Sequence, residues 1–246
     1  MTADTLAFAP DLVGPRHRLR ERLLLRLFLA ARPGPRVLNG GAGQGSFSLL
    51  LEQRGFEVTS LDSSAEAIDL LQRRVAGPVV HGSLDELAFA DGAFDAVVLG
   101  EVLEHLEDDR RGLGESVRVL RPDGVVAISV PANPRYFGPS DRWAGHVRRY
   151  TREALLALSE SGGLAVERCA GWGFPFSTLY HRYVYDRRIE HRGGSKPRSS
   201  EKAALFALAA LLEIDRLFVG VERGALGYLL VARKSRQGFE LTGSGV

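Results

Sequence analysis

A glycine-rich loop is the first stretch of the chain whose residue types and spacing could do chemistry. Residues 36–47 read Arg-Val-Leu-Asn-Gly-Gly-Ala-Gly-Gln-Gly-Ser-Phe, and further apolar residues follow at helical spacing. A strand that ends in a glycine turn and continues as a helix directs free backbone N–H groups at the space above a sheet. Because glycine has no Cβ, it adopts positive φ and lets a ligand approach the backbone. We therefore expect Gly41, Gly43 and Gly45 to lie against a bound ligand.

Asp62 is the second candidate, because it ends the alternating segment 56–61 that predicts the next strand. A carboxylate at that position can accept hydrogen bonds from both hydroxyls of a ribose, which indicates a ligand that contains adenosine. The spacing of the glycines in the loop narrows the choice of ligand class further. A dinucleotide-binding loop reads G-x-G-x-x-G, whereas here Ser46 stands where the last glycine of that fingerprint would be. This difference argues against a nicotinamide-dependent oxidoreductase.

The segment 131–150 carries the third group of candidates. A loop of this length within a compact domain is usually functional, and this one contains Asp141 and His146. We expect His146 to act as a general base, since imidazole titrates near neutral pH. Alternatively, His146 only holds the segment in place through hydrogen bonds. Asp141 is expected in an ion pair with Arg142 or Arg148 rather than in catalysis.

Alternating strands and helices must position these groups. Apolar runs predict strands, and apolar residues at helical spacing predict the helices between them. Ser63 to Glu66 forms a capped helix start, and the composition of residues 121–124 predicts a turn. This rhythm indicates a doubly wound α/β sheet with right-handed crossovers. The predicted strands cover residues 36–39, 56–61, 79–81, 94–100, 125–130, 164–169 and 225–233, and the predicted helices cover residues 16–31, 46–54, 63–75, a segment containing 117–120, 152–161 and 201–218.

The composition bounds the class of protein. The chain has 246 residues and a net charge of +2, which fits one large domain and gives no general reason to expect nucleic acid. The single cysteine, Cys169, excludes an internal disulfide and a multi-cysteine metal site. The N-terminus lacks the pattern of a signal peptide, and no apolar run of about 18 residues predicts a membrane span. We therefore expect a cytoplasmic protein, and weak association with a membrane surface stays open.

Five segments in order resemble motifs of the class I S-adenosylmethionine-dependent methyltransferases, and the resemblance spans residues 16–233. Residues 38–45 are similar to the first motif of that family, residues 61–64 to its ribose motif, and residues 82–95 to the stretch that contacts adenine. Residues 101–105 resemble the segment after the fourth strand, and residues 120–125 the turn before the fifth. Five ordered motifs make a specific match, whereas a glycine loop alone would not.

The resemblance implies a Rossmann-like sheet of seven strands, six parallel and the last antiparallel, and methyl transfer from S-adenosylmethionine. It implies a single methyltransferase domain over residues 1–246, with an N-terminal helix (15–35), a cofactor-binding core (36–131), a lid (131–150) and a helical cover or substrate insertion (172–220). The residues expected to bind the cofactor are Arg18, Asn39, Gly41, Ala42, Gly43, Gly45, Asp62, Ser63, Ser83, Leu84, Gly100, Glu101 and His105.

Two positions depart from the family pattern. Asn39 stands where the family normally has an acid that holds the amino group of the cofactor, and Ser83 replaces the Asp that takes the adenine amino group. An amide supplies no charge to an ammonium, so we expect weaker binding. Residues 101–105 also match the E-x-x-E-H of ubiquinone-pathway O-methyltransferases, where it is associated with a divalent metal. Because Glu104 and His105, as neighbours on a regular helix, do not face the same point, we expect no metal here.

Three segments allow alternative interpretations. The aromatic residues of 172–185 either line an apolar acceptor pocket or form core beneath a covering helix. The basic residues of 182–198 either attract an anionic acceptor or a lipid headgroup, or belong to a solvated loop. Arg16 and Arg18 either reach a carboxylate in the cofactor site or lie on a helix that only covers the sheet.

The favoured function is methyl transfer to a small-molecule acceptor, with O-methylation as the default. The acceptor could be lipid-like, glycosylated or a secondary metabolite. An RNA methyltransferase would need a contiguous basic face or an added binding module, which the sequence does not provide. A cofactor-binding protein with weak or no catalysis is the alternative that Asn39 motivates. The residues identify neither the acceptor nor the oligomeric state.

Overall fold

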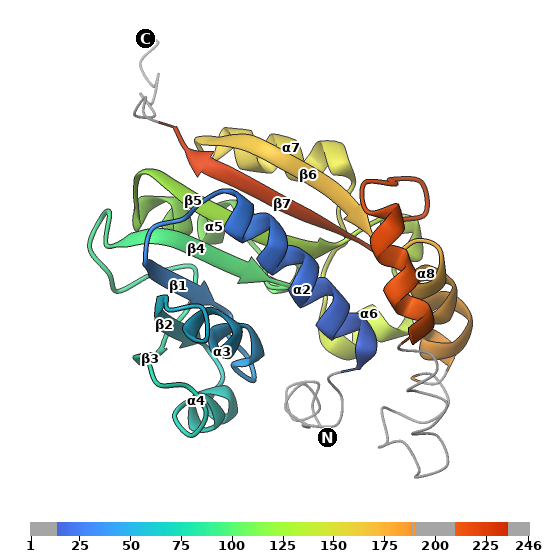
Figure 1. Cartoon of the computed structure of the whole chain (residues 1–246), viewed down its shortest axis with the longest axis horizontal. Coiled ribbons are helices and arrows are strands. Elements are labelled where there is room, and N and C mark those ends of the chain that lie inside the picture. The colour runs from blue at the N-terminus through green and yellow to red at the C-terminus, as the bar shows by residue number, and fades with distance from the viewer. Residues whose placement is uncertain (1–13, 188, 190–209, 236–246) are drawn as a thin grey trace.

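A seven-stranded mixed sheet forms the centre of the molecule in the computed structural model, which describes residues 14–187, 189 and 210–235 (Figure 1). The strand order is β3-β2-β1-β4-β5-β7-β6, and β7 runs antiparallel to both of its neighbours. This arrangement confirms the predicted Rossmann-like α/β sheet with one antiparallel strand. The strands are β1 (Arg36–Gly40), β2 (Glu57–Asp62), β3 (Val79–His81), β4 (Phe94–Gly100), β5 (Leu120–Pro131), β6 (Leu164–Trp172) and β7 (Gly227–Lys234).

Helices cover both faces of the sheet, as the near-continuous apolar sequence of β4 requires. On one face, α2 and α3 bury residues such as Phe28 and Leu51 against Val98. On the other face, α5 and α7 bury residues such as Leu113 and Leu155 in a second apolar cluster. These helices, together with α4 beside β2 and β3, are α2 (Pro15–Ala30), α3 (Ser46–Glu52), α4 (Ala65–Leu71), α5 (Asp109–Arg118) and α7 (Arg152–Ser161).

Helix starts follow the capping residues of the sequence. The hydroxyl of Ser64 accepts a hydrogen bond from the backbone N–H of Ala67 at the start of α4, and that of Thr151 accepts one from Ala154 at the start of α7. Pro15 occupies the first turn of α2, where its missing N–H is not needed. These local signals explain why most predicted helix starts agree with the structure.

The turn predicted over residues 121–124 is wrong, because β5 begins at Leu120 and runs through this segment. Leu120 pairs with Phe94 of β4, and the register then shifts before Val125 pairs with Ala96. Asp123 has a φ of +61°, so the backbone is irregular within the strand. The turn-like composition therefore marks a bulge.

The sequence also predicted that two helices would end later than they do. In the structure α4 ends at Leu71 and α5 ends at Arg118.

The predicted lid is folded rather than irregular. It contains the 3-10 turn η3 (Pro134–Tyr136) and the helix α6 (Pro139–Ala144), and a bridge between Ala132 and Tyr150 closes it against the sheet. Three more short elements surround it: η2 (Leu103–His105), α8 (Phe176–Tyr180) and the π-helical turn η4 (His181–Tyr185). The 3-10 segment η5 (Glu213–Phe218) packs on α8. Together they cover the end of the sheet where β1, β4 and β5 finish (Figure 1).

Some predictions fall outside the described residues. These are the N-terminal arm before residue 14, most of the basic segment, the first part of the helix predicted over 201–218, and the tail beyond residue 235. Within the aromatic segment 172–185, Trp172 is buried in the core, whereas Tyr183 is exposed and does not belong to the core.

Candidate functional site

The glycine loop between β1 and α3 has the conformation that its sequence predicts. Gly41, Gly43 and Gly45 all have positive φ, at 65°, 52° and 80°. A Cβ on Gly41 would lie 2.5 Å from Val102, so this position accommodates only glycine without displacing its neighbour. In contrast, no atom lies within 4 Å of a Cβ built on Gly43. The loop is therefore packed on one side and open on the side where a ligand would approach.

Asp62, at the end of β2, holds this loop in place. One carboxylate oxygen accepts a hydrogen bond from the backbone N–H of Gly43 at 2.8 Å, and the other accepts one from Ser64 at 3.0 Å. Each oxygen keeps a second lone pair, because a carboxylate offers about four acceptor positions. Ser63 is exposed beside it, and Ala42 is buried beneath the loop. Asp62 is thus positioned both to order the loop and to accept from hydroxyl groups.

Asn39 lies below the loop, in a buried polar chain. Its side-chain amide donates to the hydroxyl of Ser48 at 2.8 Å, and that hydroxyl lies 2.7 Å from the hydroxyl of Ser60. The chain links β1, α3 and β2. The residue that departs from the family pattern therefore joins three elements beneath the loop.

Ser83 and Leu84 follow β3. The hydroxyl of Ser83 accepts a hydrogen bond from the backbone N–H of Asp85 at 3.1 Å, which closes a local turn. Leu84 is buried, and a Cβ on Gly40 would lie 2.8 Å from its side chain. The structure thus places Leu84 beside the end of β1, near the start of the glycine loop.

Glu101 has a strained backbone directly after β4, with a φ of +62°. Its backbone N–H donates to the carbonyl of Ser129, and one carboxylate oxygen lies 3.3 Å from a guanidinium nitrogen of Arg20 in α2. The other carboxylate oxygen of Glu101 and the Nε of Arg20 are both buried, and neither has a hydrogen-bond partner among the described residues. Gly100, just before it, faces open space. A buried donor and a buried acceptor are therefore both left unsatisfied at this end of the sheet.

The first turns of α2 contribute more polar groups than the sequence suggested. Glu21 is buried and accepts hydrogen bonds from His17 at 2.9 Å and from Ser46 of the glycine loop at 2.5 Å. Burial alone would raise the pKa of Glu21, but the hydrogen bonds from His17 and Ser46 lower it below its usual value. Arg18, the predicted cofactor residue of this helix, is exposed. Arg20 is the arginine that reaches the end of β4.

In the lid, His146 and Asp141 form a hydrogen-bonded pair with a separation of 2.9 Å between Nδ1 and Oδ1. Asp141 is buried and also accepts from Nε of Arg149 at 2.8 Å, so the predicted partners Arg142 and Arg148 are wrong. Arg148 instead pairs with Asp109. Burial would raise the pKa of Asp141, but the hydrogen bonds from His146 and Arg149 lower it to about 2. The carboxylate is therefore charged near neutral pH.

Arg149 continues this network toward α2. It lies 2.9 Å from Nε2 of His181, and Arg16 contacts the other ring nitrogen of His181. Burial, Arg16 and Arg149 together lower the pKa of His181 to about 2, so its imidazole is neutral. Arg16 also stacks over the ring of Tyr185, at 4.3 Å from the centroid. Arg16 thus ties α2 to the cover helices.

Glu104 is completely buried, and neither of its carboxylate oxygens has a hydrogen-bond partner within the part of the chain that the structure describes. Burial, followed by the nearby charge of Glu101, raises the pKa of Glu104 well above its usual value. One of its oxygens lies 3.9 Å from Nε2 of His146, and the rings of His105 and His146 are 4.7 Å apart. A donor atom from each of Glu104, His105 and His146 lies within 4.8 Å of the others. Glu104 and His105 thus bring donor atoms near one another although they are neighbours in the 3-10 turn η2, so the expectation that they would not face one point is wrong.

The core of the chain is similar in sequence to known proteins. Residues 38–128 match a family model described as a methyltransferase domain. The chain is 36% identical over 135 residues to a demethylmenaquinone methyltransferase of Beutenbergia cavernae, which covers 54% of this chain and 53% of that protein. It is 33% identical over 124 residues to a malonyl-[acyl-carrier protein] O-methyltransferase of Pectobacterium atrosepticum, which covers 50% and 48%. Residues 38–128 thus form a methyltransferase domain, and the chain is similar to S-adenosylmethionine-dependent methyltransferases.

The fold of these methyltransferases extends beyond the matched core. A crystal structure of an S-adenosylmethionine-dependent methyltransferase from Mesorhizobium loti aligns with a TM-score of 0.59 and 21% identity, and the alignment covers 87% of this chain and 97% of that one. The chain spans about half the length of the curated relatives it matches. The family model matches residues 38–128, so the lid and the cover helices lie outside the matched core.

Sequence reasoning missed several polar residues of this methyltransferase site. His17 and Glu21 stand four residues apart on one helical face, and this i, i+4 spacing was a signal that could have identified them. The match at 101–105 included Glu104, but its burial without a partner depends on how η2 packs. Arg149 and His181 are distant in sequence, and no local pattern connects them.

Proposed function

We propose that this chain transfers a methyl group from S-adenosylmethionine to a small-molecule acceptor. The single observation that carries the proposal is the pair of buried, unsatisfied atoms at the end of β4, the Nε of Arg20 and the free carboxylate oxygen of Glu101. An amino acid zwitterion presents a carboxylate and an ammonium, which are the groups these two atoms would satisfy. The methionine part of the cofactor is such a zwitterion.

The remaining cofactor contacts follow from the open side of the glycine loop. Backbone N–H groups of Gly41, Gly43 and Gly45 would face the methionine part, and Asp62 would accept from the ribose hydroxyls. Leu84 would contact the adenine ring. When bound, S-adenosylmethionine supplies a methyl group activated by a sulfonium, so the protein mainly aligns the acceptor and removes its proton.

His146 is our candidate for that base. Its Nδ1 lies 2.9 Å from the charged Asp141, so Nδ1 carries the imidazole proton and donates a hydrogen bond to the carboxylate. The lone pair of Nε2 is then available to accept a proton from the acceptor. A hydroxyl group needs such a base more than an amine does, which favours O-methylation. The name of the relative from Pectobacterium atrosepticum includes O-methyl transfer and supports the same choice. The expectation of a cytoplasmic location stays a prediction.

Two arginines on the same helix test the cofactor assignment. Arg20→Met should lower the affinity for S-adenosylhomocysteine about 10- to 100-fold, as measured by calorimetry, because a buried charge-assisted hydrogen bond is lost. The exposed Arg18→Met is the matched control and should bind as the wild type does. Methylthioadenosine, which lacks the amino acid group, should bind both variants equally. If Arg20→Met lowered the affinity for both ligands equally, the assignment of Arg20 would be contradicted. If Arg18→Met lowered the affinity for S-adenosylhomocysteine, Arg18 would be a cofactor-binding residue, as the sequence predicted.

The acceptor needs a separate experiment. The protein should be incubated with S-adenosylmethionine labelled on the methyl group and with a small-molecule extract of host cells, and the labelled product should then be identified. Label in a compound with a new methyl ether supports O-methylation. Label on nitrogen or carbon would correct that assignment, and tight cofactor binding without any labelled product would favour a protein that binds the cofactor without catalysis.

A further inference from the structure

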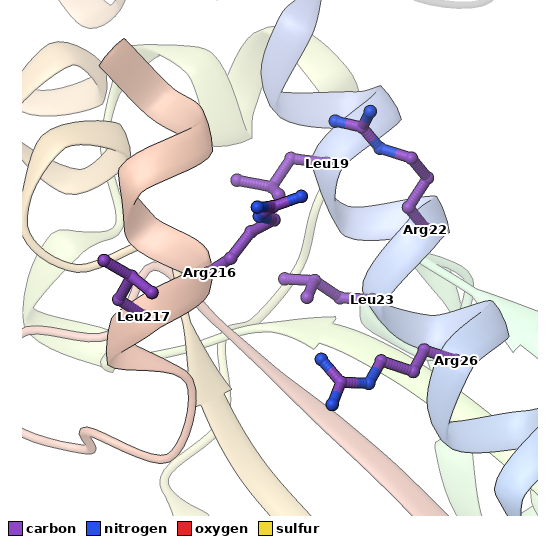
Figure 2. Close-up of a pocket in the computed structure, with 6 residues that line it drawn as sticks. All are labelled: Leu19, Arg22, Leu23, Arg26, Arg216 and Leu217. Atoms are coloured by element: carbon purple, nitrogen blue, oxygen red, sulfur yellow. The ribbon is translucent and has the colours of Figure 1, made fainter. Parts of the chain in front are cut away.

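A groove lies between α2 and η5 (Figure 2). Leu19 and Leu23 of α2 form its floor, and they are almost fully buried. Arginines from both elements form its walls, and Leu217 of η5 also contributes to the lining, although its side chain projects from the side of η5 turned away from α2. The groove thus combines an apolar floor with a cationic border. The arginines are Arg22, Arg26 and Arg216.

The segment η5 beside this groove exposes several apolar side chains. Leu217 is 79% exposed, and Ile214 and Phe218 of the same segment are also exposed. Their exposure does not come from a loosely attached segment. Asp215, between them, is fully buried and accepts hydrogen bonds from the backbone N–H groups of Phe176 and Ser177 at the start of α8. η5 is therefore held in one orientation that directs Leu217 outward.

The charges around the groove are predominantly positive. Arg22 and Arg216 both form an ion pair with Glu213, so a single negative charge is shared by two positive charges. Arg26 is exposed and has no ion-pair partner within the described ranges. Three arginines and one glutamate leave an excess of positive charge beside the exposed apolar side chains. This combination of Leu and Phe with arginine is typical of elements that lie in the plane of a lipid interface.

We propose that the face formed by α2 and η5 binds an anionic lipid surface. Arg22, Arg26 and Arg216 would contact the headgroups, while Leu217 and Phe218 would enter the boundary of the acyl chains. Two other partners fit less well. Nucleic acid would use the arginines but would leave Leu217 in contact with water. A second copy of the chain, related by a two-fold axis, would bring Arg26 against the arginines of its partner.

The proposed contact is with the surface of a membrane and does not require a helix that crosses it. In the part of the chain that the structure describes, no helix is long and apolar enough to cross a bilayer. The proposed contact is peripheral, and it does not depend on the proposed methyl transfer, because no residue of the glycine loop or of the lid takes part.

Sedimentation with vesicles tests the proposal. The full chain should pellet with vesicles of phosphatidylcholine mixed with phosphatidylglycerol and stay in the supernatant with phosphatidylcholine alone. Binding should weaken as salt is added. Arg26→Glu should lower the partition coefficient by at least about fivefold, since each basic residue near an anionic surface contributes roughly that factor. Leu217→Asp should also lower it, and at 79% exposure this change leaves the folded core intact.

The matched control is Arg110→Glu, an exposed arginine on α5 at the opposite face of the sheet. It makes the same change in net charge and should bind vesicles as the wild type does. Equal loss in Arg110→Glu and Arg26→Glu would show only a general charge effect and would overturn the proposal. Failure of the wild type to pellet with anionic vesicles would do the same, as would a dimer that Leu217→Asp dissociates. Cofactor binding by calorimetry should be unchanged in all three variants.

Discussion

Nδ1 of His146 lies 2.9 Å from Oδ1 of Asp141, and the same carboxylate oxygen lies 2.8 Å from Nε of Arg149. Asp141 therefore does two things at once. It fixes the orientation and the tautomer of the imidazole, and it anchors the lid through a buried ion pair. An acid that appeared in the sequence to be only a structural partner is thus the group that orients the candidate base.

His146→Gln should lower turnover by about 10²- to 10⁴-fold, because a general base contributes roughly that factor. The measurement is kcat with the acceptor found in the labelling experiment. Binding of S-adenosylhomocysteine should stay within about twofold of the wild type, since the cofactor contacts lie on other residues. Arg142→Gln, at an exposed position of the same lid, is the control and should retain activity. A large loss of cofactor affinity in His146→Gln would show that His146 has a structural role.

Glu104→Gln should raise the free energy of unfolding near neutral pH. The pKa of Glu104 is raised in the folded protein, so folding favours its protonated form. Native stability is then lost as the pH rises above the ordinary glutamate pKa of about 4.3, because the unfolded chain ionises first. The variant should melt higher than the wild type near pH 8, by roughly 2–4 °C for each kcal/mol recovered. The difference should vanish near pH 4, and a difference that is independent of pH would contradict the assignment.

Zinc should inhibit methyl transfer. Glu104, His105 and His146 offer three donor atoms within 4.8 Å of one another, and imidazole and carboxylate are common zinc ligands. A bound ion would occupy His146 and remove the base. Inhibition should be reversed by a chelator and should weaken at acid pH, where the ligands are protonated. His105→Ala should require more zinc for the same inhibition. Stimulation of turnover by zinc would instead show that the cluster needs a metal.

Asn39→Leu should lower the free energy of unfolding by about 1–3 kcal/mol, because its removal disrupts a buried hydrogen-bonded chain. The side chain contacts Ser48 beneath the loop, so S-adenosylhomocysteine should bind with an affinity close to that of the wild type. Chemical unfolding and calorimetry on the same variant separate the two effects. Weaker cofactor binding without a loss of stability would indicate that Asn39 contacts the amino group of the cofactor, as the family pattern suggests.

The parts of this methyltransferase that the sequence predicts well are those whose causes are local. The glycine loop and Asp62 lie within one strand–turn–helix unit, and their residue types allow few conformations. The strand order follows from the alternation of strands and helices together with the family resemblance. The segment 121–124 was mistaken for a turn, because its composition is turn-like while its pairing partner lies on β4.

The parts that could not be predicted depend on how separate elements are oriented. Arg20 rather than Arg18 reaches Glu101, and this choice follows from the rotation of α2 about its own axis over the sheet. Four arginines lie within eight residues of Asp141 in the sequence, and only the folding of the lid selects Arg149 among them. Such long-range pairings leave no periodic signal in one sequence.

The position of β7 has a consequence for the order in which the molecule can be completed during synthesis. β7 follows the other six strands of the described sheet in sequence and leaves the ribosome after them, yet it is inserted between β5 and β6. Within the described sheet, β6 pairs only with β7, so β6 cannot join the sheet until residues 227–234 are available. A nascent chain that already contains the glycine loop, Glu101 and His146 would therefore still present the open edge of β5. We expect stalled or truncated chains to associate through that edge.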